Sequence, residues 1–224
     1  CMVGPFWLAV GATVIALPLG VSTAVYLTEY GGSGRFVEAI RLAVSNLSGV
    51  PSVIFGLFGL TFFVTICGFG VSLLSGVLTL AVLALPIVIN TTEAALNQVP
   101  QAWREASLAL GANKQQTIFK IILPAALPGI LTGNILALSR VAGETAAIMY
   151  TAAVFYTPKM SDSILDPVMS LPYHIYVLAT SSVDVDATRR MQYGTACLLV
   201  LMVLGLNMVA LFIRQRAQRK IARQ

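Results

Sequence analysis

The sequence predicts an all-α bundle of membrane-spanning helices, and three observations support this fold class. Hydrophobic residues make up 57% of the 224 residues and charged residues only 10%, and the mean hydropathy is +0.84. Soluble domains of this size are far less apolar. Several segments stay apolar over the ~20 residues that a spanning helix needs, and none alternates between apolar and polar residues as the strands of a membrane barrel do.

Five segments meet this length criterion, and we expect them to form the spans of a single membrane domain that occupies residues 1–224. Pro18, Pro51 and Pro86 lie inside or at the ends of these segments, where neighbouring helices can satisfy the carbonyl groups that a proline frees. The expected spans are approximately residues 5–27, 45–67, 71–89, 128–155 and 194–213.

A polar stretch at residues 93–124 interrupts the apolar sequence and is predicted to lie in water. Residues 101–110 are largely good helix formers, and Pro100 suits the first turn, where a missing N–H is harmless. Gly111 follows at the position where helices commonly end in a left-handed residue. We therefore expect a short helix over residues 101–110.

A second short helix is predicted to follow the first. Asn113 and Gln116 have the spacing of a capping box, in which each side chain bonds the backbone N–H of the other residue. This helix is expected to run toward Leu123 and to stop before Pro124, because proline cannot continue the helical hydrogen-bond pattern.

One face of the first short helix is a candidate docking surface. Trp103, Ala106 and Leu110 fall at positions i, i+3 and i+7, which places them on one narrow apolar stripe. Arg104 and Glu105 lie beside this stripe. We interpret the stripe as a contact for a partner protein.

The distribution of basic residues predicts the orientation of the chain. With residues 93–124 in the cytoplasm, ten Lys and Arg residues lie inside and three outside, while Arg140 stays in the membrane; this asymmetry follows the positive-inside rule. The C-terminus is then cytoplasmic, and residues 157–192 form an external segment. The basic tail is interpreted as a stop-transfer anchor beside membrane lipid, and we expect no nucleic-acid partner, because the basic residues are scattered.

Motifs for other kinds of site are lacking. Cys1, Cys67 and Cys197 have none of the close pairings of zinc or redox sites, and the Asp residues of the external segment have no calcium-ligand spacing. The glycine-rich residues 31–35 lack the Lys-Ser/Thr of a phosphate-binding loop. We therefore expect no catalytic residue, no metal and no cofactor in this chain.

Arg140 and Glu144 form a charged pair inside the predicted span 128–155. Residues four apart share one face of a helix, and an Arg at the membrane centre costs ~2.5–3.5 kcal/mol on insertion scales. Such residues generally face a bundle interior or an aqueous path, and they mark functional sites. A purely structural ion pair is the alternative.

The polar stretch resembles the EAA signature of the permeases of ABC importers, in which Glu-Ala-Ala is followed by Gly and then by Ile-x-Leu-Pro. Ser107 replaces the third member of Glu-Ala-Ala. The matching residues are Glu105, Ala106, Gly111, Ile121, Leu123 and Pro124.

This resemblance implies the type I ABC-importer permease fold with six spans, so that one span would be missing ahead of the five. It also implies that the stretch 93–124 is a cytoplasmic coupling loop, whose helix fits into a cleft of an ATPase subunit. The residues expected at this contact are Trp103, Arg104, Glu105, Ala106 and Gly111.

Residues 50–60, 121–133 and the Gly-Glu-Thr at 143–145 resemble the phosphate-importer permeases more narrowly. Two permeases pair in that family, called PstA and PstC, and the sequence looks closer to the PstA branch, although Ala147 stands where many relatives have Pro. The resemblance implies that Arg140, Glu144 and Thr145 line the phosphate path. A guanidinium suits this role because its planar fork of donors matches the oxygens of phosphate.

The same resemblance implies the partners and the location of the chain. It would pair with a PstC-like permease, a PstB-like cytoplasmic ATPase that binds ATP and Mg²⁺, and an external PstS-like phosphate-binding protein. The assembly would lie in a bacterial or archaeal inner membrane. This chain would be the permease subunit of an ATP-driven phosphate importer, and not itself an enzyme.

Two other functions remain open. A permease for sulfate or molybdate is one, because many ABC importers share the EAA stretch. An intramembrane hydrolase that uses Glu144 or His174 is the other, although no HExxH motif, no GxSxG motif and no clustered acid pair supports it.

Overall fold

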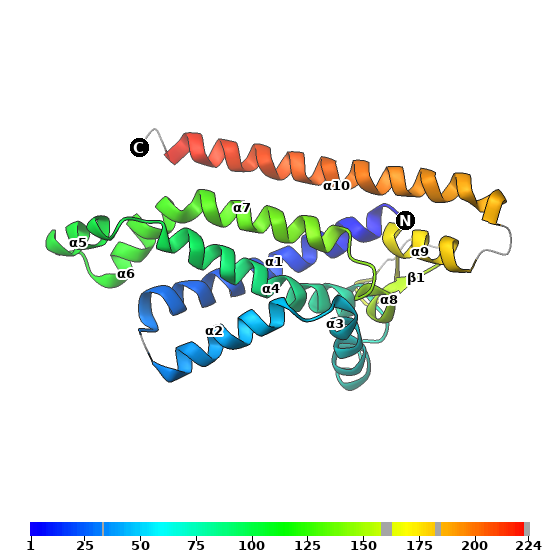
Figure 1. Cartoon of the computed structure of the whole chain (residues 1–224), viewed down its shortest axis with the longest axis horizontal. Helices are drawn as coiled ribbons and strands as arrows, with labels where there is room; N and C mark the ends of the chain where they lie inside the picture. The colour runs from blue at the N-terminus through cyan, green and yellow to red at the C-terminus, as the bar shows by residue number, and fades with distance from the viewer. Residues whose placement is uncertain (33, 158–162, 182–184, 222–224) are drawn as a thin grey trace. The chain divides into compact units, whose positions relative to one another are not determined.

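The computed structural model describes residues 1–32, 34–157, 163–181 and 185–221, and helices dominate it (Figure 1). Three of the helical segments, η1 to η3, are π-helical, which means that their turns are wider than those of an α-helix. The first half of the chain contains α1 (Val3–Val25), η1 (Tyr26–Tyr30), α2 (Arg35–Ser48), α3 (Ser52–Gly59), η2 (Leu60–Ile66) and α4 (Leu73–Asn97). The second half contains α5 (Gln101–Ala109), α6 (Lys114–Thr117), η3 (Ile118–Ile122), α7 (Leu123–Ala142), α8 (Ile148–Thr151), β1 (Ala153–Val154), β2 (Val168–Met169), α9 (Leu171–Thr180) and α10 (Val185–Ile221).

The chain forms two compact units, and α1, α4, α7 and α10 each contribute to both. Unit 1 comprises Cys1–Ala16, Val50–Ala84 and Leu138–Met208. Unit 2 comprises Leu17–Gly49, Leu85–Ala137 and Val209–Gln224.

Four helical stretches of the described chain are long and apolar enough to cross a membrane. They are Val3–Tyr30, Leu73–Asn97, Lys114–Ala142 and Thr188–Arg216. The expected spans 5–27 and 194–213 lie within two of these stretches, and the expected span 71–89 overlaps a third, which begins at Leu73. The other two expected spans need correction.

The expected straight span over residues 45–67 is instead a broken pair of helices. α2 ends at Ser48, and Ser52–Ile66 continues at an angle of 104° to it. Pro51 explains the break, because a proline disfavours helical geometry in the residue before it and supplies no N–H. A fifth crossing exists only if the two arms of this pair together form one.

The expected span over residues 128–155 lies earlier in the chain, and its helix ends at Ala142. The second short helix does not stop before Pro124, as expected, but continues through it to form the stretch Lys114–Ala142. The π-helical segment η3 ends two residues before Pro124, and the N–H of Leu123 bonds the carbonyl of Ile118, five residues earlier. A wide turn of this kind accommodates a proline, which cannot donate the usual bond.

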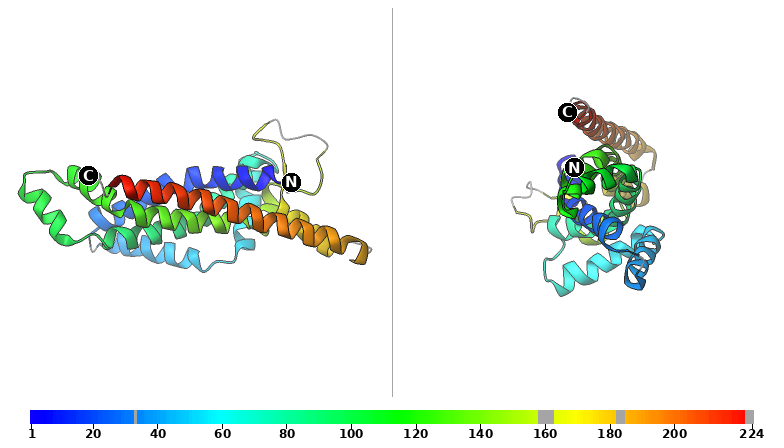
Figure 2. Two further views of the ribbon diagram at one scale, coloured as in Figure 1. Left: turned by 90° about the horizontal axis from the view of Figure 1, so that it is seen from above. Right: turned by 90° about the vertical axis from the view of Figure 1, so that its left-hand side faces the viewer.

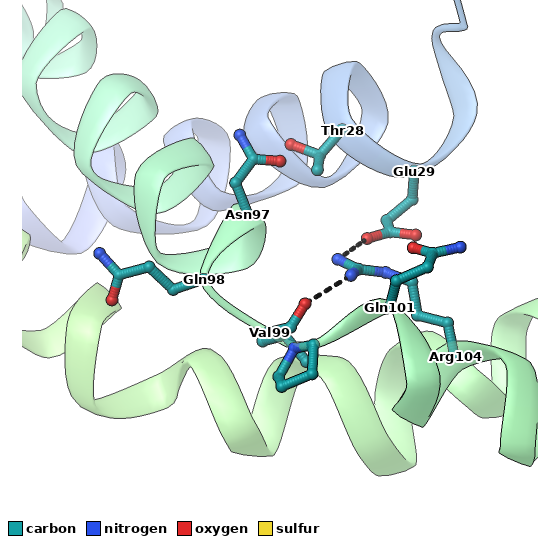
Figure 3. A pocket seen from close by; sticks show the side chains of 8 residues that line it. Thr28, Glu29, Asn97, Gln98, Val99, Gln101 and Arg104 are labelled. Atoms are coloured by element: carbon teal, nitrogen blue, oxygen red, sulfur yellow. Dashed lines mark hydrogen bonds and ion pairs between the residues drawn. The ribbon is translucent and has the colours of Figure 1, made fainter.

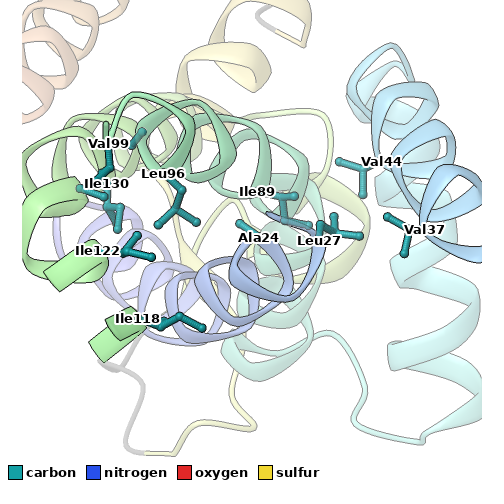
Figure 4. Close-up of a cluster of buried hydrophobic side chains, with 12 residues drawn as sticks. Ala24, Leu27, Val37, Val44, Ile89, Leu96, Val99, Ile118, Ile122 and Ile130 are labelled. Carbon is teal, nitrogen blue, oxygen red and sulfur yellow. The ribbon is translucent and has the colours of Figure 1, made fainter. Parts of the chain in front are cut away.

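The core of unit 2 is a cluster of buried aliphatic side chains (Figure 4). It joins the end of α1 and the π segment after it to α2, α4 and the start of α7. Small residues allow α4 and α7 to approach closely, since a Cβ atom on Gly129 would overlap Ala95 and one on Gly133 would overlap Thr91. The members labelled in Figure 4 are Ala24, Leu27, Val37, Val44, Ile89, Leu96, Val99, Ile118, Ile122 and Ile130.

Unit 1 contains a small element that the all-α prediction did not include. Strands β1 and β2 pair in parallel, with Ala153 opposite Val168. The loop before β2 covers the start of α4, where Leu73 N–H bonds the carbonyl of Asp166 at 2.8 Å and Leu74 N–H bonds that of Ile164 at 2.9 Å. These bonds satisfy N–H groups that the first turn of a helix leaves free.

The predicted external segment 157–192 is described in part. It contains β2, α9 and the start of α10. Lys159, Asp162 and Asp184 lie outside the described residues.

The close contact at Gly133 leads to a stability prediction. We expect Gly133→Val to lower the free energy of unfolding by about 1–3 kcal/mol, because overpacking forces neighbouring groups apart. The measurement is the thermal unfolding midpoint of the purified chain in detergent. Gly205→Val is the matched control, because a Cβ atom at Gly205 meets no atom within 4 Å. Equal midpoints for both variants would contradict the prediction.

Candidate functional site

The candidate site begins with helix α5, which extends from Gln101 to Ala109. Pro100 holds the N-cap position, one residue before the predicted first turn, with φ −57° and ψ 137°. The left-handed end is confirmed, because Gly111 has φ +85°. A residue with a Cβ atom is strained in that conformation, whereas glycine adopts it freely.

Helix α6 is joined to α5 by local hydrogen bonds. The predicted capping box is confirmed: Asn113 N–H bonds Gln116 Oε1 at 2.9 Å, and Gln116 N–H bonds Asn113 Oδ1 at 2.8 Å. Ser107 Oγ and Thr117 Oγ1 lie 2.9 Å apart, and both residues are buried. Ser107, which replaces the second alanine of Glu-Ala-Ala, therefore links α5 to α6 through its hydroxyl group.

The outer face of α5 is exposed and apolar. Trp103 is 53% exposed and Leu110 90% exposed, and Ala106 between them is also exposed. We call the hollow beside them the docking groove; its volume is about 860 Å³. Its other lining residues include Lys120, Ile121 and Pro124 of η3 and α7. Figures 1 and 2 show α5 and α6 beyond the last turn of α4, at the end of unit 2.

The Arg104 side chain extends toward Glu29 and Val99, within unit 2 (Figure 3), and it does not line the docking groove. Its side chain is 15% exposed. The guanidinium donates to the carbonyls of Val99 at 2.7 Å and Leu96 at 2.9 Å, and to Glu29 Oε1 at 3.0 Å. A polar pocket of about 520 Å³, lined also by Asn97, lies beside this ion pair. The predicted role of Arg104 at a partner contact remains a prediction.

A second ion pair lies nearby in unit 2. Arg41 Nη2 is 3.2 Å from Glu93 Oε1, and it also donates to the carbonyl of Leu27 at 3.0 Å. Glu93, the first residue of the predicted coupling loop, lies in α4.

Sequence reasoning missed Glu29 as the partner of Arg104. The available signal was a lone acidic residue directly after a long apolar segment.

Arg140 and Glu144 do not share a helix face, so that part of the prediction is wrong. Arg140 is exposed in the last turn of α7, and Glu144 follows the end of the helix. Among the described residues, no ion pair joins them. Next to Arg140, Ser139 Oγ bonds Asn207 Oδ1 of α10 at 2.5 Å. The assignment of Arg140, Glu144 and Thr145 to a substrate path stays a prediction.

His174 lies in α9 and stacks on Phe155, with ring centroids 5.0 Å apart. Burial, together with the positive N-terminal amino group, lowers the pKa of this histidine. Within the described part of the chain, no cluster of three His, Cys, Asp or Glu residues could hold a metal ion.

Comparison with known proteins identifies the class. Residues 16–223 match the family described as binding-protein-dependent transport system inner membrane component. The chain belongs to this family, and it is a multi-pass inner-membrane protein.

Individual relatives extend the comparison. The chain is 40% identical to the phosphate transport system permease protein PstA of Mycobacterium leprae, over 95% of this chain and 68% of that protein. It is 38% identical to PstA 1 of Mycobacterium tuberculosis H37Rv, over 93% of this chain and 67% of that protein. It is 34% identical to a probable ABC transporter permease protein, YqgI, of Bacillus subtilis, over 96% of this chain and 77% of that protein.

Solved structures confirm the predicted fold. A chain of the MetNI methionine ABC transporter in an inward-facing conformation matches with a TM-score of 0.75 and 22% identity, over 96% of this chain and 92% of that chain. A chain of an amino acid ABC transporter matches with a TM-score of 0.57 and 16% identity, over 93% and 90% of the two chains. These likenesses support the fold of an ABC-importer permease.

The left-handed Gly111 leads to a prediction for the α5–α6 segment. We expect Gly111→Val to speed cleavage within residues 98–117 about tenfold in limited proteolysis, because the left-handed conformation costs a bulky residue roughly 1–2 kcal/mol. Gly111→Asn is the matched variant, since asparagine tolerates this conformation better. A Cβ atom at Gly111 meets no other atom within 4 Å, so steric overlap does not contribute to the expected effect. Equal cleavage rates in Gly111→Val and the unmodified chain would contradict the prediction.

Proposed function

We propose that this chain is one of two permease subunits of an ATP-driven importer of inorganic phosphate. The observation that carries the proposal is the preformed α5–α6 hairpin, which presents an apolar groove to water at the end of a membrane-helix bundle. Exposed patches of large apolar residues on otherwise polar segments commonly mark protein contacts. An ATPase subunit fits this surface, because the chain belongs to a family of transport-system membrane components.

In the coupling contact, Trp103, Ala106 and Leu110 enter a cleft of the ATPase. Glu105 is exposed beside them and supplies a charged contact at the rim. Gly111 ends the helix so that the apolar stripe stays open to the partner. ATP and Mg²⁺ bind to the ATPase, and this chain has no cofactor and no enzymatic activity of its own.

Phosphate is proposed as the cargo on the strength of the named PstA relatives. Arg140, Glu144 and Thr145 lie on the phosphate path. Arg140 lies in the last turn of α7, where the partly negative end of the helix dipole would repel an anion; the guanidinium offsets this field and donates to phosphate oxygens. Glu144 keeps the empty path from being strongly cationic, so that phosphate can leave.

The proposed assembly also contains a PstC-like second permease, a PstB-like ATPase and an external PstS-like binding protein. The α5–α6 hairpin and the C-terminus face the cytoplasm, in keeping with the excess of basic residues on that side. The external segment 157–192 then faces the binding protein. Sulfate and molybdate are the alternative cargoes, because many importers share the EAA stretch.

Transport by the reconstituted importer tests this function. The chain would be combined with its neighbouring permease, ATPase and binding protein in liposomes, and ATP-dependent uptake of labelled phosphate would be measured. We expect uptake that needs ATP and that excess sulfate or molybdate does not reduce. Uptake of labelled sulfate or molybdate in place of phosphate would contradict the phosphate assignment and leave the coupling contact standing.

Substitution of Arg140 tests the phosphate path. We expect Arg140→Gln to lower phosphate uptake by at least about tenfold, because a hydrogen bond to a charged group contributes about 1.5–3 kcal/mol. Arg140→Lys keeps the charge but loses the planar fork, and we expect it to transport at an intermediate rate. Arg35→Gln, at the exposed start of α2, is the matched control. Normal uptake by Arg140→Gln, with the four subunits assembled, would overturn the assignment.

A further inference from the structure

We propose that Glu29 is a positioning residue of the importer: its ion pair with Arg104 transmits movement of α5 to the membrane helix Val3–Tyr30. Glu29 lies outside the EAA signature and 75 residues before Arg104. The inference rests on the proposed function, because it takes α5 as the contact of an ATPase. Figure 3 shows the ion pair at the junction of the elements that it joins.

Arg104 couples α5 rigidly to two other elements. Its guanidinium has three partners: the carbonyls of Leu96 and Val99, at the end of α4 and just after it, and the carboxylate of Glu29. The two carbonyls lie where a helix leaves acceptors unsatisfied, and a planar guanidinium suits several fixed acceptors at once. A displacement of α5 therefore displaces Arg104 and the groups that it holds.

Glu29 depends on this contact. Its side chain is 9% exposed and lies in η1, at the end of the long helical stretch Val3–Tyr30. The C-terminal end of a helix is partly negative, which makes it an unfavourable place for a carboxylate. Within the described chain, Arg104 is the one cation in an ion pair with Glu29. The position of η1 is thus tied electrostatically to that of α5.

A second contact links the same two parts of unit 2. Lys114 Nζ, at the start of α6, lies 4.7 Å from the centroid of the Tyr30 ring. Ser107 and Thr117 bond α5 to α6, so the hairpin can move as one body. The hairpin therefore holds the end of η1 at Glu29 through α5 and at Tyr30 through α6.

The ion pair between Arg41 and Glu93 provides a matched comparison. It joins α2 to α4, and neither residue belongs to α5. It is also more open to water, with side chains 47% and 16% exposed, and exposed pairs are weak. Of these two ion pairs, which are those found among the described residues, Arg104–Glu29 is the one that joins the docking helix to a membrane helix.

The test uses the complete importer in liposomes and measures the number of anions imported per ATP hydrolysed. Uptake is measured for phosphate, sulfate and molybdate, so that the ratio is taken with whichever anion the importer carries. The variants are Glu29→Gln, Arg104→Gln and the double substitution, with Glu29→Asp as the conservative change. Glu93→Gln is the control for loss of an ion pair. Co-purification of the ATPase and the thermal midpoint show whether each variant assembles.

We expect Glu29→Gln to lower the imported anions per ATP about tenfold, within the range that coupling between two sites commonly spans, while the ATPase stays bound and active. The double substitution should lose no more than either single one, because both remove the same link. In Glu29→Asp, the number of anions imported per ATP should lie between the values of Glu29→Gln and the unmodified importer. In Glu93→Gln, it should equal that of the unmodified importer.

Three results would overturn the inference. The first is an unchanged ratio in Glu29→Gln. The second is a double substitution whose loss equals the product of the single losses, which would make the two residues independent. The third is release of the ATPase or failure to assemble in Glu29→Gln, which would make Glu29 a residue of the fold or of the docking surface. Import of sulfate in place of phosphate would refute the proposed cargo and leave this test intact.

Discussion

The absence of hydrogen-bonding water in a lipid bilayer is the constraint on which the rest of this structure depends. Every interruption of a membrane helix must find partners for the backbone groups that it frees. Within unit 2, hydroxyl side chains bond backbone carbonyls at two prolines: Ser22 Oγ bonds the carbonyl of Pro18 at 2.6 Å and Thr132 Oγ1 bonds that of Pro128 at 2.7 Å. Bonds of this kind, from a side chain to the carbonyl four residues earlier, often accompany a helix bend. The π-helical segment before Pro124 accommodates a third proline by widening the turn.

The position of Arg104 follows from another set of unpaired backbone groups, those at the end of a helix. Helix α4 ends in carbonyl groups without intrahelical partners, and the guanidinium of Arg104 satisfies two of the carbonyls at this end. An isolated helix of the length of α5 would be marginal in water, so α5 is stabilised chiefly by inward contacts such as those of Arg104 and Ser107. Neighbouring helical positions differ in direction by about 100°, so inward contacts leave Trp103 on the outer side. A short helix can therefore be firmly held and still present an apolar surface.

The sequence predicted those features that local chemistry determines. The end of α5 at Gly111 and the capping box of α6 each depend on residues a few positions apart, so their patterns are visible in the chain. The long apolar segments of the sequence located most of the spans but not their ends. Hydropathy is averaged over many residues, so it does not show where a helix stops within an apolar segment, as α7 does at Ala142. The pairing of Glu29 with Arg104 could not be predicted, since it joins residues 75 positions apart. Only the packing of unit 2 brings them together.

The end of α7 at Ala142 changes the physical reasoning about Arg140. A guanidinium in the middle of a span would carry the full cost of burial in hydrocarbon. Arg140 instead lies in the last turn of the stretch Lys114–Ala142, whose 29 residues exceed the ~20 needed to cross the hydrocarbon core. There the side chain can reach the polar edge of the membrane, and the partly negative helix end stabilises its charge. An arginine at this position stays charged and accessible at low cost, which are the properties that a binding group for an anion requires.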